Sequence, residues 1–203
     1  MWQLNSDNLA ATCVATLEEH KGKWYNSDHS VSSVAFHPTA PILATGSYDE
    51  TVKLWRLNSD NSAATCVATL RGHYCNVLTV AFHPTAPILA SGSENRFFKL
   101  WRLNSDNSAA VGVLTVDTHS SGIYSVAFHP IQPILATGGC DRTAKLWRLN
   151  SDCSDATCVA TLELTDVMAK QTDQKNHNNY IDVAFHPTAP ILATGSEQPF
   201  LWG

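Results

Sequence analysis

The residues of this chain best suited to chemistry are nine histidines and six cysteines, set among many aspartates and serines. Histidines and carboxylates brought together could hold a metal or act as general acids and bases, and clustered cysteines could bind zinc. The cysteines, however, form no CxxC pair, and the chain contains no GxSxG, HExxH or glycine-rich phosphate loop. The sequence therefore predicts no catalytic residue, no metal site and no cofactor.

Four of the histidines belong to a repeated segment, VAFHP. They are His37, His83, His129 and His186. The first three copies are 46 residues apart, and a constant period of this size is typical of propellers, solenoids and arrays. Histidines on separate repeats could share a metal only around a central channel, so we interpret them as structural.

The elements that would position these residues are short strands separated by turns. The second repeat predicts strands at Thr65–Leu70, Asn76–Phe82, Pro87–Gly92 and Phe97–Leu103. The segments between them, HPTAP, SENR and NSDNSAA, are rich in Pro, Asn, Asp and Ser and are typical of turns. Four strands in a unit of about 40–45 residues indicate a β-propeller, whose blades fold only against one another.

The order of GH, VAFHP, LATGSYDE and TVKLW resembles the WD40 repeat, and the resemblance covers essentially the whole chain. It implies a single all-β domain over residues 1–203, a WD40-type β-propeller with four blades' worth of four-stranded antiparallel sheets. The repeats span approximately residues 10–57, 62–103, 109–149 and 156–203.

The resemblance also implies one buried hydrogen-bonded set in each blade, made of a loop His, a strand Ser or Thr, a turn Asp and a strand Trp. The third repeat supplies His119, Thr137, Asp141 and Trp147. The second supplies His73, Ser91 and Trp101, with Asn95 in place of the aspartate. The first supplies Thr45, Asp49 and Trp55, with either His20 or His29. The fourth keeps Thr194 and Trp202, with His177 as its histidine candidate.

Composition limits the other classes of function. Charged residues are 15% of the chain, too few for a typical coiled coil or disordered tail. The net charge of -5 excludes a basic nucleic-acid surface over the whole domain. Neither an apolar run of ~18 residues nor a signal peptide is evident, so we expect no membrane span and a cytoplasmic protein.

The four repeats differ most in two places: the loops between blades, and the turns between the second and third strands. Both connections emerge at one end of an antiparallel blade, which we call the variable rim. HPTAP and LNSDN, which emerge at the other end, vary little. Because strand packing alone does not demand a constant LNSDN loop, we interpret the variable rim as a binding surface on a constant scaffold.

In WD40 proteins, rim residues before and within the first strand, and the residue before the turn aspartate, make most partner contacts. The matching positions here are Ser30, Ser32, Tyr48, Asn76, Leu78, Glu94, Gly122, Tyr124, Cys140, Asn179, Ile181 and Glu197. No Lys or Arg is among them, which favours a protein or peptide partner over phosphate or nucleic acid. The resemblance thus implies a non-catalytic protein–protein interaction scaffold.

Two other functions remain open at this point. One is a propeller enzyme with a site in the central channel, which would need titratable residues converging there. The other is a fragment of a longer WD40 protein with no autonomous activity.

The predicted strands also raise a question of ring closure. Trp2 belongs to a third strand, Thr12–Leu17 is an outer strand without a blade of its own, and Phe200–Trp202 is a third strand without an outer partner. Four blades in one ring would each turn by about 90°, whereas eight blades from two chains would turn by about 45°. We therefore expect either an open partial propeller or a homodimer in which each chain lends its first strand to the other's fourth blade.

Overall fold

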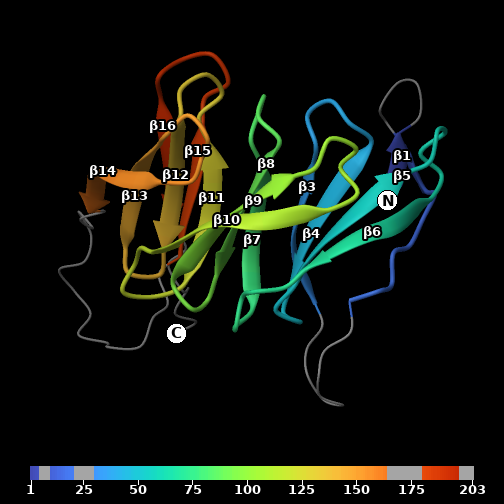
Figure 1. The fold of residues 1–203 in the computed structure, drawn as a ribbon, viewed down its shortest axis with the longest axis horizontal. Coiled ribbons are helices and arrows are strands. Elements are labelled where there is room, and N and C mark those ends of the chain that lie inside the picture. The colour runs from blue at the N-terminus through green and yellow to red at the C-terminus, as the bar shows by residue number, and fades with distance from the viewer. Residues whose placement is uncertain (5–9, 21–29, 164–179, 197–203) are drawn as a thin grey trace, which may run out of the picture.

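The computed structural model describes residues 1–4, 10–20, 30–163 and 180–196. Within these residues the chain forms sixteen β-strands and no helix, which confirms the all-β fold class (Figure 1). The described part consequently contains no helix that could span a membrane.

Twelve of the strands form three four-stranded antiparallel sheets, blades 1 to 3, in each of which the strands are ordered as in the sequence. Blade 1 contains β3 (Val31–Phe36), β4 (Ile42–Ser47), β5 (Val52–Leu57) and β6 (Ala64–Leu70). Blade 2 contains β7 (Val77–Phe82), β8 (Ile88–Ser93), β9 (Phe97–Leu103) and β10 (Ala110–Asp117). Blade 3 contains β11 (Ile123–Phe128), β12 (Ile134–Gly139), β13 (Thr143–Leu149) and β14 (Ala156–Glu163).

The other four strands form two separate hairpins. The N-terminal hairpin pairs β1 (Trp2–Leu4) with β2 (Ala11–Cys13). The C-terminal hairpin pairs β15 (Ile181–Phe185) with β16 (Leu192–Ser196). By sequence, the first corresponds to the third and fourth strands of a blade, and the second to the first and second strands.

The core lies between neighbouring blades. The second strands β4, β8 and β12, each flanked by the first and third strands of its own sheet, are buried at every residue. Ile42 and Leu54 of blade 1 pack in one cluster with Val77 and Leu89 of blade 2. A blade therefore depends on its neighbours for most of its apolar contacts, which explains why the sequence carries several repeats together.

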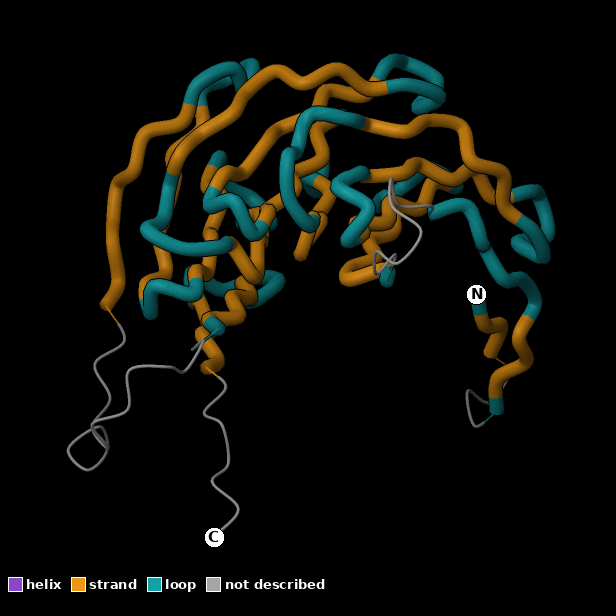
Figure 2. Tube along the Cα trace, turned by 90° about the horizontal axis from the view of Figure 1, so that it is seen from below, coloured by secondary structure: helices purple, strands orange, loops and turns teal. Residues whose placement is uncertain are grey.

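The blades follow an open arc, with the N-terminal hairpin at one end and the C-terminal hairpin at the other (Figure 2). At the first end, no first strand precedes β3 among the described residues. Val34 and Phe36 are therefore 61% and 63% exposed, whereas Val80, the blade 2 equivalent of Val34, is 5% exposed. In the residues that the structure describes, the chain thus forms part of a propeller, with three four-stranded blades and two two-stranded hairpins.

Candidate functional site

The variable rim is anchored in blade 3 by a chain of buried hydrogen bonds. Trp147 Nε1 donates to Thr137 Oγ1 over 3.0 Å, and Thr137 Oγ1 lies 2.8 Å from His119 Nε2. The other ring nitrogen, His119 Nδ1, is 2.9 Å from Asp141 Oδ1. Burial lowers the pKa of His119, which fits a neutral ring that accepts from Thr137 and donates to Asp141. These bonds tie the loop before blade 3 to the turn between β12 and β13.

Blade 1 contains the same arrangement, with His20 as its histidine. His20 Nδ1 is 2.8 Å from Asp49 Oδ2, and His20 Nε2 is 2.6 Å from Thr45 Oγ1. Trp55 Nε1 donates to Thr45 over 2.9 Å. Burial raises the pKa of Asp49, but hydrogen bonds from His20 and Thr51 outweigh it and bring the pKa to about 2. His29, the other candidate, lies outside the described residues.

Blade 2 has an incomplete set. His73 Nε2 is 2.7 Å from Ser91 Oγ, which also accepts from Trp101 Nε1 over 2.8 Å. Asn95 stands where the other blades have aspartate, and the buried Nδ1 of His73 has no partner among the described residues. Burial, with Lys99 nearby, lowers the pKa of His73 to about 3. In the fourth repeat, Thr194 is exposed, and His177 and Trp202 lie outside the described residues.

Six of the predicted rim residues are joined in pairs by the backbone. Tyr48 N donates to Ser30 O over 3.1 Å, Glu94 N to Asn76 O over 3.0 Å, and Cys140 N to Gly122 O over 2.9 Å. Each pair links the loop before a blade to the turn between its second and third strands. The three blades thus present these positions in the same register, all on the variable rim.

Three further rim residues occupy β-bulges. Ser32, Leu78 and Tyr124 are skipped in the pairing between the first and second strands of their blades. A bulge changes the direction in which a side chain projects. All three line a single cavity of about 650 Å³, the central pocket, which strands from several blades surround. The rest of its lining is Ser33, Thr79, Ser125, Tyr180, Asp182 and Gly195.

The C-terminal hairpin departs from this pattern and requires a correction. β15 pairs with β16 without a bulge, and Ile181 pairs with Ser196 as Val77 pairs with Ser93. Ile181 is only 1% exposed, so it packs in the core and was wrongly assigned to the rim. The missing bulge residue shifts the count along the strand by one position. Two other predicted rim residues, Asn179 and Glu197, lie outside the described residues.

Tyr180 is a pocket residue that the sequence analysis missed. Its ring stacks on that of Tyr124, with centroids 3.7 Å apart and an interplanar angle of 21°. Burial, together with a hydrogen bond to Tyr180, raises the pKa of Tyr124 to about 12, so its phenol stays protonated at neutral pH. The two rings give the central pocket an aromatic wall.

The hydroxyls of Ser33, Thr79 and Ser125 were also missed. Each accepts a hydrogen bond from a backbone N–H of the next blade: Ser33 from Val80 over 3.1 Å, Thr79 from Val126 over 3.3 Å, and Ser125 from Val183 over 3.2 Å. The signal was present in the sequence as a Ser or Thr before VAFHP in three repeats. In the fourth repeat this position is Asp182, whose Oδ1 accepts from Ser125 Oγ over 2.5 Å.

The constant end of the blades has a structural reason that the sequence analysis did not foresee. In the LNSDN turn after β5, Asn58 Oδ1 accepts from Ala63 N over 3.0 Å, and Asp60 Oδ1 accepts from Ser62 N over 3.0 Å. Asn61 adopts a φ of 57°, a conformation that asparagine tolerates well. The turn is therefore constrained by its own hydrogen bonds, and its constancy is not evidence for binding at the opposite end. The feature of the rim that bears on binding is instead the central pocket.

The described residues include no group of three or more His, Cys, Asp or Glu side chains arranged to hold a metal ion. The VAFHP histidines act within the turns instead. His37 Nδ1 accepts from Ala40 N over 2.9 Å, and His83 Nδ1 accepts from Ala86 N over the same distance.

Parts of this sequence and fold are similar to those of known proteins. The family model described as "WD domain, G-beta repeat" matches residues 11–56, 64–102 and 111–148. Coatomer subunit alpha-1 of Arabidopsis thaliana is 40% identical over 72 residues, which are 34% of this chain and 5% of that protein. The solved structure of Saccharomyces cerevisiae Sqt1 superposes with a TM-score of 0.61 at 17% identity, covering 69% of this chain and 36% of that one. The chain thus spans only a small part of the coatomer subunit and about a third of the Sqt1 chain.

Proposed function

Because the chain belongs to the WD40 repeat family, we propose that it is a non-catalytic scaffold that binds a polypeptide partner at its variable rim. WD40 propellers are typically protein-interaction scaffolds. The binding surface we propose consists of the central pocket and the paired rim residues around it.

The observation that carries this proposal is the lining of the central pocket. The Tyr124–Tyr180 stack and the half-buried Leu78 supply aromatic and apolar surface, and Asp182 supplies one carboxylate. Aromatic side chains in a pocket are the usual anchors of protein–protein contacts, and an unpaired cation on the partner would complement a carboxylate. We therefore propose a partner segment that carries an apolar or aromatic residue next to Lys or Arg.

The test is selection of peptides from a phage-displayed random library on the immobilised chain, followed by affinity measurements on the selected peptides. Replacing Tyr124 and Leu78 together with alanine is expected to weaken binding at least about tenfold, the loss typical of an anchor residue. The far-UV circular dichroism spectrum should not change, because Tyr124 is 37% exposed and Leu78 is only half-buried.

Two control variants make the result specific. Ile131→Ala removes an apolar side chain that is 78% exposed in the opposite, constant end of blade 3, and it should leave affinity unchanged. Trp147→Ala is expected to lower the free energy of unfolding by about 3–5 kcal/mol, because it empties a buried aromatic site. Equal losses of affinity in the Ile131 and rim variants would refute the rim assignment. Substrate turnover in a broad hydrolase screen would favour the propeller enzyme instead. The cytoplasmic location of the protein stays a prediction.

A further inference from the structure

The central pocket has two layers, and their order follows from the direction of the first strands. Each first strand begins at the variable rim, because the loop between blades lies there, so its earlier residues are nearer the rim. In blades 1 to 3 the β-bulge brings two consecutive residues to the pocket, and in β15 regular alternation brings Tyr180 and Asp182. The entrance layer is Ser32, Leu78, Tyr124 and Tyr180, and the inner layer is Ser33, Thr79, Ser125 and Asp182.

The two layers differ in their chemistry. The Tyr124–Tyr180 stack and Leu78 make most of the entrance layer apolar. The inner layer, by contrast, consists of three hydroxyls and one carboxylate. Gly195, which pairs with Asp182 in the C-terminal hairpin, adds no side chain to it. A ligand group that enters from the rim therefore meets apolar surface first and oxygen atoms behind it.

The hydroxyls of the inner layer are held in place as acceptors. Each of them already accepts one backbone N–H of the next blade, over 3.1–3.3 Å. A hydroxyl oxygen has two acceptor lone pairs, so each hydroxyl keeps one lone pair for a ligand. Thr79 and Ser125 are only 7% and 8% exposed. A hydrogen bond formed there is largely shielded from water, which strengthens it.

The junctions between blades fix the positions of these hydroxyls. At each junction the VAFHP histidine makes an edge contact with a phenylalanine of the next blade, and a glycine in the second strand makes room for the first residue of the next first strand. A Cβ added at Gly46 would lie 2.8 Å from Val77 Cγ1, and one at Gly92 would lie 2.7 Å from Ile123 Cγ2. Three identical junctions thus order the inner layer before a ligand binds, which lowers the entropic cost of binding. The ring pairs are His37–Phe82, His83–Phe128 and His129–Phe185, with centroids 4.9–5.0 Å apart.

Asp182 offers a ligand one oxygen of its carboxylate. Its Oδ1 accepts from Ser125 Oγ over 2.5 Å and from Val183 N over 2.9 Å, whereas no described residue donates to its Oδ2. Ser125 is therefore a positioning residue that orients the carboxylate. An arginine guanidinium pairs best with both oxygens of a carboxylate. An ammonium group needs only one of them, and it can direct its other N–H groups to the hydroxyls.

The electrostatics of the pocket favour a cation. No Lys, Arg or His is among the described residues that line it. On the rim beside Tyr124, burial together with the carboxylates of Asp141 and Glu94 raises the pKa of the Cys140 thiol to about 11. Arg96, in the same turn as Glu94, is paired with Asp117 of β10 over 3.2 Å. Negative charge near the pocket therefore attracts a positively charged partner group.

We infer that the central pocket binds the side chain of a lysine of the partner. The four-carbon stem would lie along the Tyr124–Tyr180 stack and Leu78. The ammonium group would donate to Asp182 Oδ2 and to the free lone pairs of the inner hydroxyls. Lysine side chains commonly divide in this way between an apolar stem and a charged head. The inference rests on the proposed function, because it names the partner residue that the rim binds.

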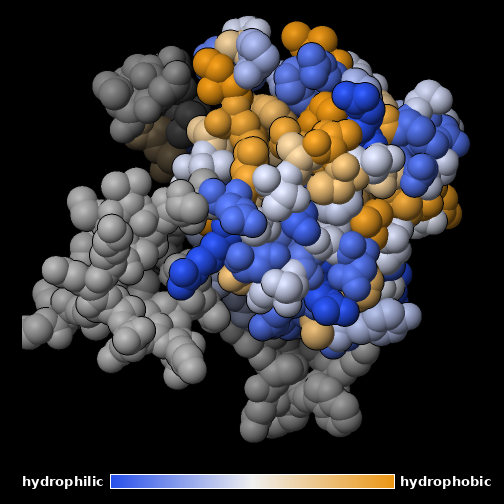
Figure 3. Space-filling model, turned by 90° about the vertical axis from the view of Figure 1, so that its left-hand side faces the viewer, coloured by the Kyte–Doolittle hydropathy of each residue, from blue (hydrophilic) through white to orange (hydrophobic). Residues whose placement is uncertain are grey.

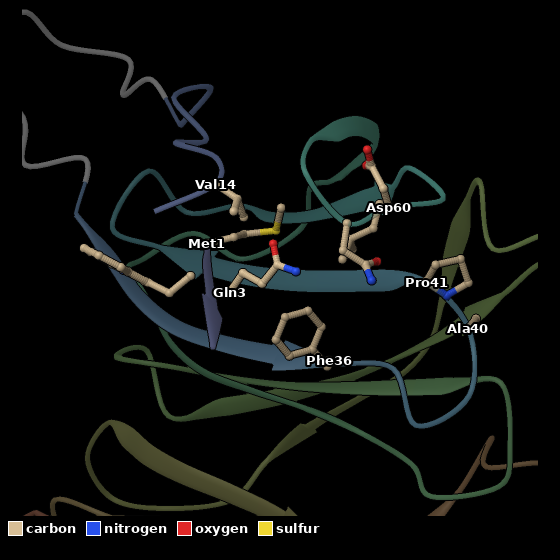
Figure 4. Close-up of a pocket in the computed structure, with 10 residues that line it drawn as sticks. Met1, Gln3, Val14, Phe36, Ala40, Pro41 and Asp60 are labelled. Atoms are coloured by element: carbon tan, nitrogen blue, oxygen red, sulfur yellow. The ribbon is translucent and has the colours of Figure 1, made fainter. Parts of the chain in front are cut away.

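Other exposed parts of the molecule lack this order of layers. Figure 4 shows a cavity of about 400 Å³ between the N-terminal hairpin and blade 1, with the apolar Met1, Val14 and Phe36 in its walls. Its described lining contains Asp60 but no Ser or Thr, so no ring of hydroxyls surrounds that carboxylate. Figure 3 looks at the end of the molecule that carries blade 3 and shows hydrophobic side chains exposed beside hydrophilic ones. Exposed apolar surface alone thus does not distinguish the central pocket, but its two layers do.

The test uses the peptides selected on the immobilised chain, resynthesised with an acetylated N-terminus so that only lysine can supply a primary ammonium. We expect each peptide that depends on Tyr124 and Leu78 to contain one lysine whose replacement by norleucine lowers affinity at least about tenfold. Norleucine keeps the four-carbon stem but removes the charge and the donors. Trimethyl-lysine keeps the charge without an N–H, and arginine carries a planar group, so each should also bind at least about tenfold more weakly. Equal affinity of the lysine peptide and any of these three peptides would overturn the inference.

Variants of the protein locate the ammonium group. Asp182→Asn should weaken the lysine peptide at least about tenfold and leave the norleucine peptide unchanged, so that the two bind almost equally. Asp155→Asn, which removes an exposed carboxylate from the turn before β14, is the matched control and should change neither affinity. Ser125→Ala should reduce the preference for lysine over norleucine, and Ser125→Thr, which keeps the hydroxyl, should retain it. A preference for lysine that survives Asp182→Asn would contradict the assignment.

The outcomes separate this inference from the proposed function. Peptides that lose affinity when Tyr124 and Leu78 are replaced, but that require no lysine, would leave the scaffold proposal standing and refute the lysine pocket. Selection of no peptide at all would refute both.

Discussion

At the scale of single residues, His73 is the exception among the loop histidines. His20 and His119 each place Nδ1 against an aspartate, but the Nδ1 of His73 is buried without a partner among the described residues. A buried polar group without a hydrogen bond costs free energy, so blade 2 carries a penalty that the two neighbouring blades avoid.

Asn95→Asp should remove this penalty by giving His73 the acceptor that Asp49 and Asp141 provide in the other blades. We expect the free energy of unfolding at pH 7 to rise by about 1 kcal/mol, the net value of a typical hydrogen bond. Asp141→Asn is the reciprocal variant, and it should destabilise blade 3 by a similar or larger amount. Denaturant titrations of both variants measure the change, and a loss of stability in Asn95→Asp would contradict the explanation.

His73 also predicts a pH dependence. Its pKa in the folded protein, about 3, is below the value of 6.5 of an unperturbed histidine, so the unfolded chain binds the proton more readily. This histidine therefore favours the folded state fully above pH 6.5, and its contribution is lost as the pH falls toward 3. The unfolding free energy should decline over this range, and less steeply in His73→Gln. Parallel slopes for the two proteins would exclude His73 as a source of the pH dependence.

At the scale of elements, the hydroxyl contacts between blades are the most regular feature of the fold. Thr79 Oγ1 accepts from Val126 N, so Thr79→Val keeps the shape of the side chain but leaves that buried N–H without an acceptor. We expect a loss of about 1–3 kcal/mol in the free energy of unfolding. Thr85→Val, in the exposed turn after β7, is the control and should change stability little.

The elements also show which parts of the site the sequence could predict. Spacing from the VAFHP segments located every first strand and placed Ser32, Leu78 and Tyr124, because blades 1 to 3 share the same bulge. The same count failed at Ile181, because a bulge is one residue that leaves hydrophobic spacing almost unchanged while it exchanges the two faces of the strand. Tyr180 was missed for the same reason.

At the scale of the whole molecule, the repeat places Cys13, Cys66 and Cys158 at equivalent positions of three separate sheets. All six cysteines are free thiols in the structure, for example Cys66 in β6 and Cys158 in β14. Disulfides require Cα atoms within about 7 Å, and none of the six thiols is paired in the structure. Adding a reductant should therefore leave the melting temperature of the unsubstituted chain unchanged in differential scanning calorimetry, and a drop of several degrees would contradict this.

The identical junctions bear on how such a molecule can lengthen. A duplication of one 46-residue unit copies both contact faces of a blade together. In blade 2, for example, Gly92, Thr79 and His83 contact blade 3, and Val77, Val80 and Phe82 contact blade 1. The new unit is consequently compatible with both of its neighbours from its first generation, before selection has acted on it. Point changes in a junction, by contrast, must be matched across two blades. This asymmetry favours lineages that change their number of blades by whole copies and diversify afterwards in the loops.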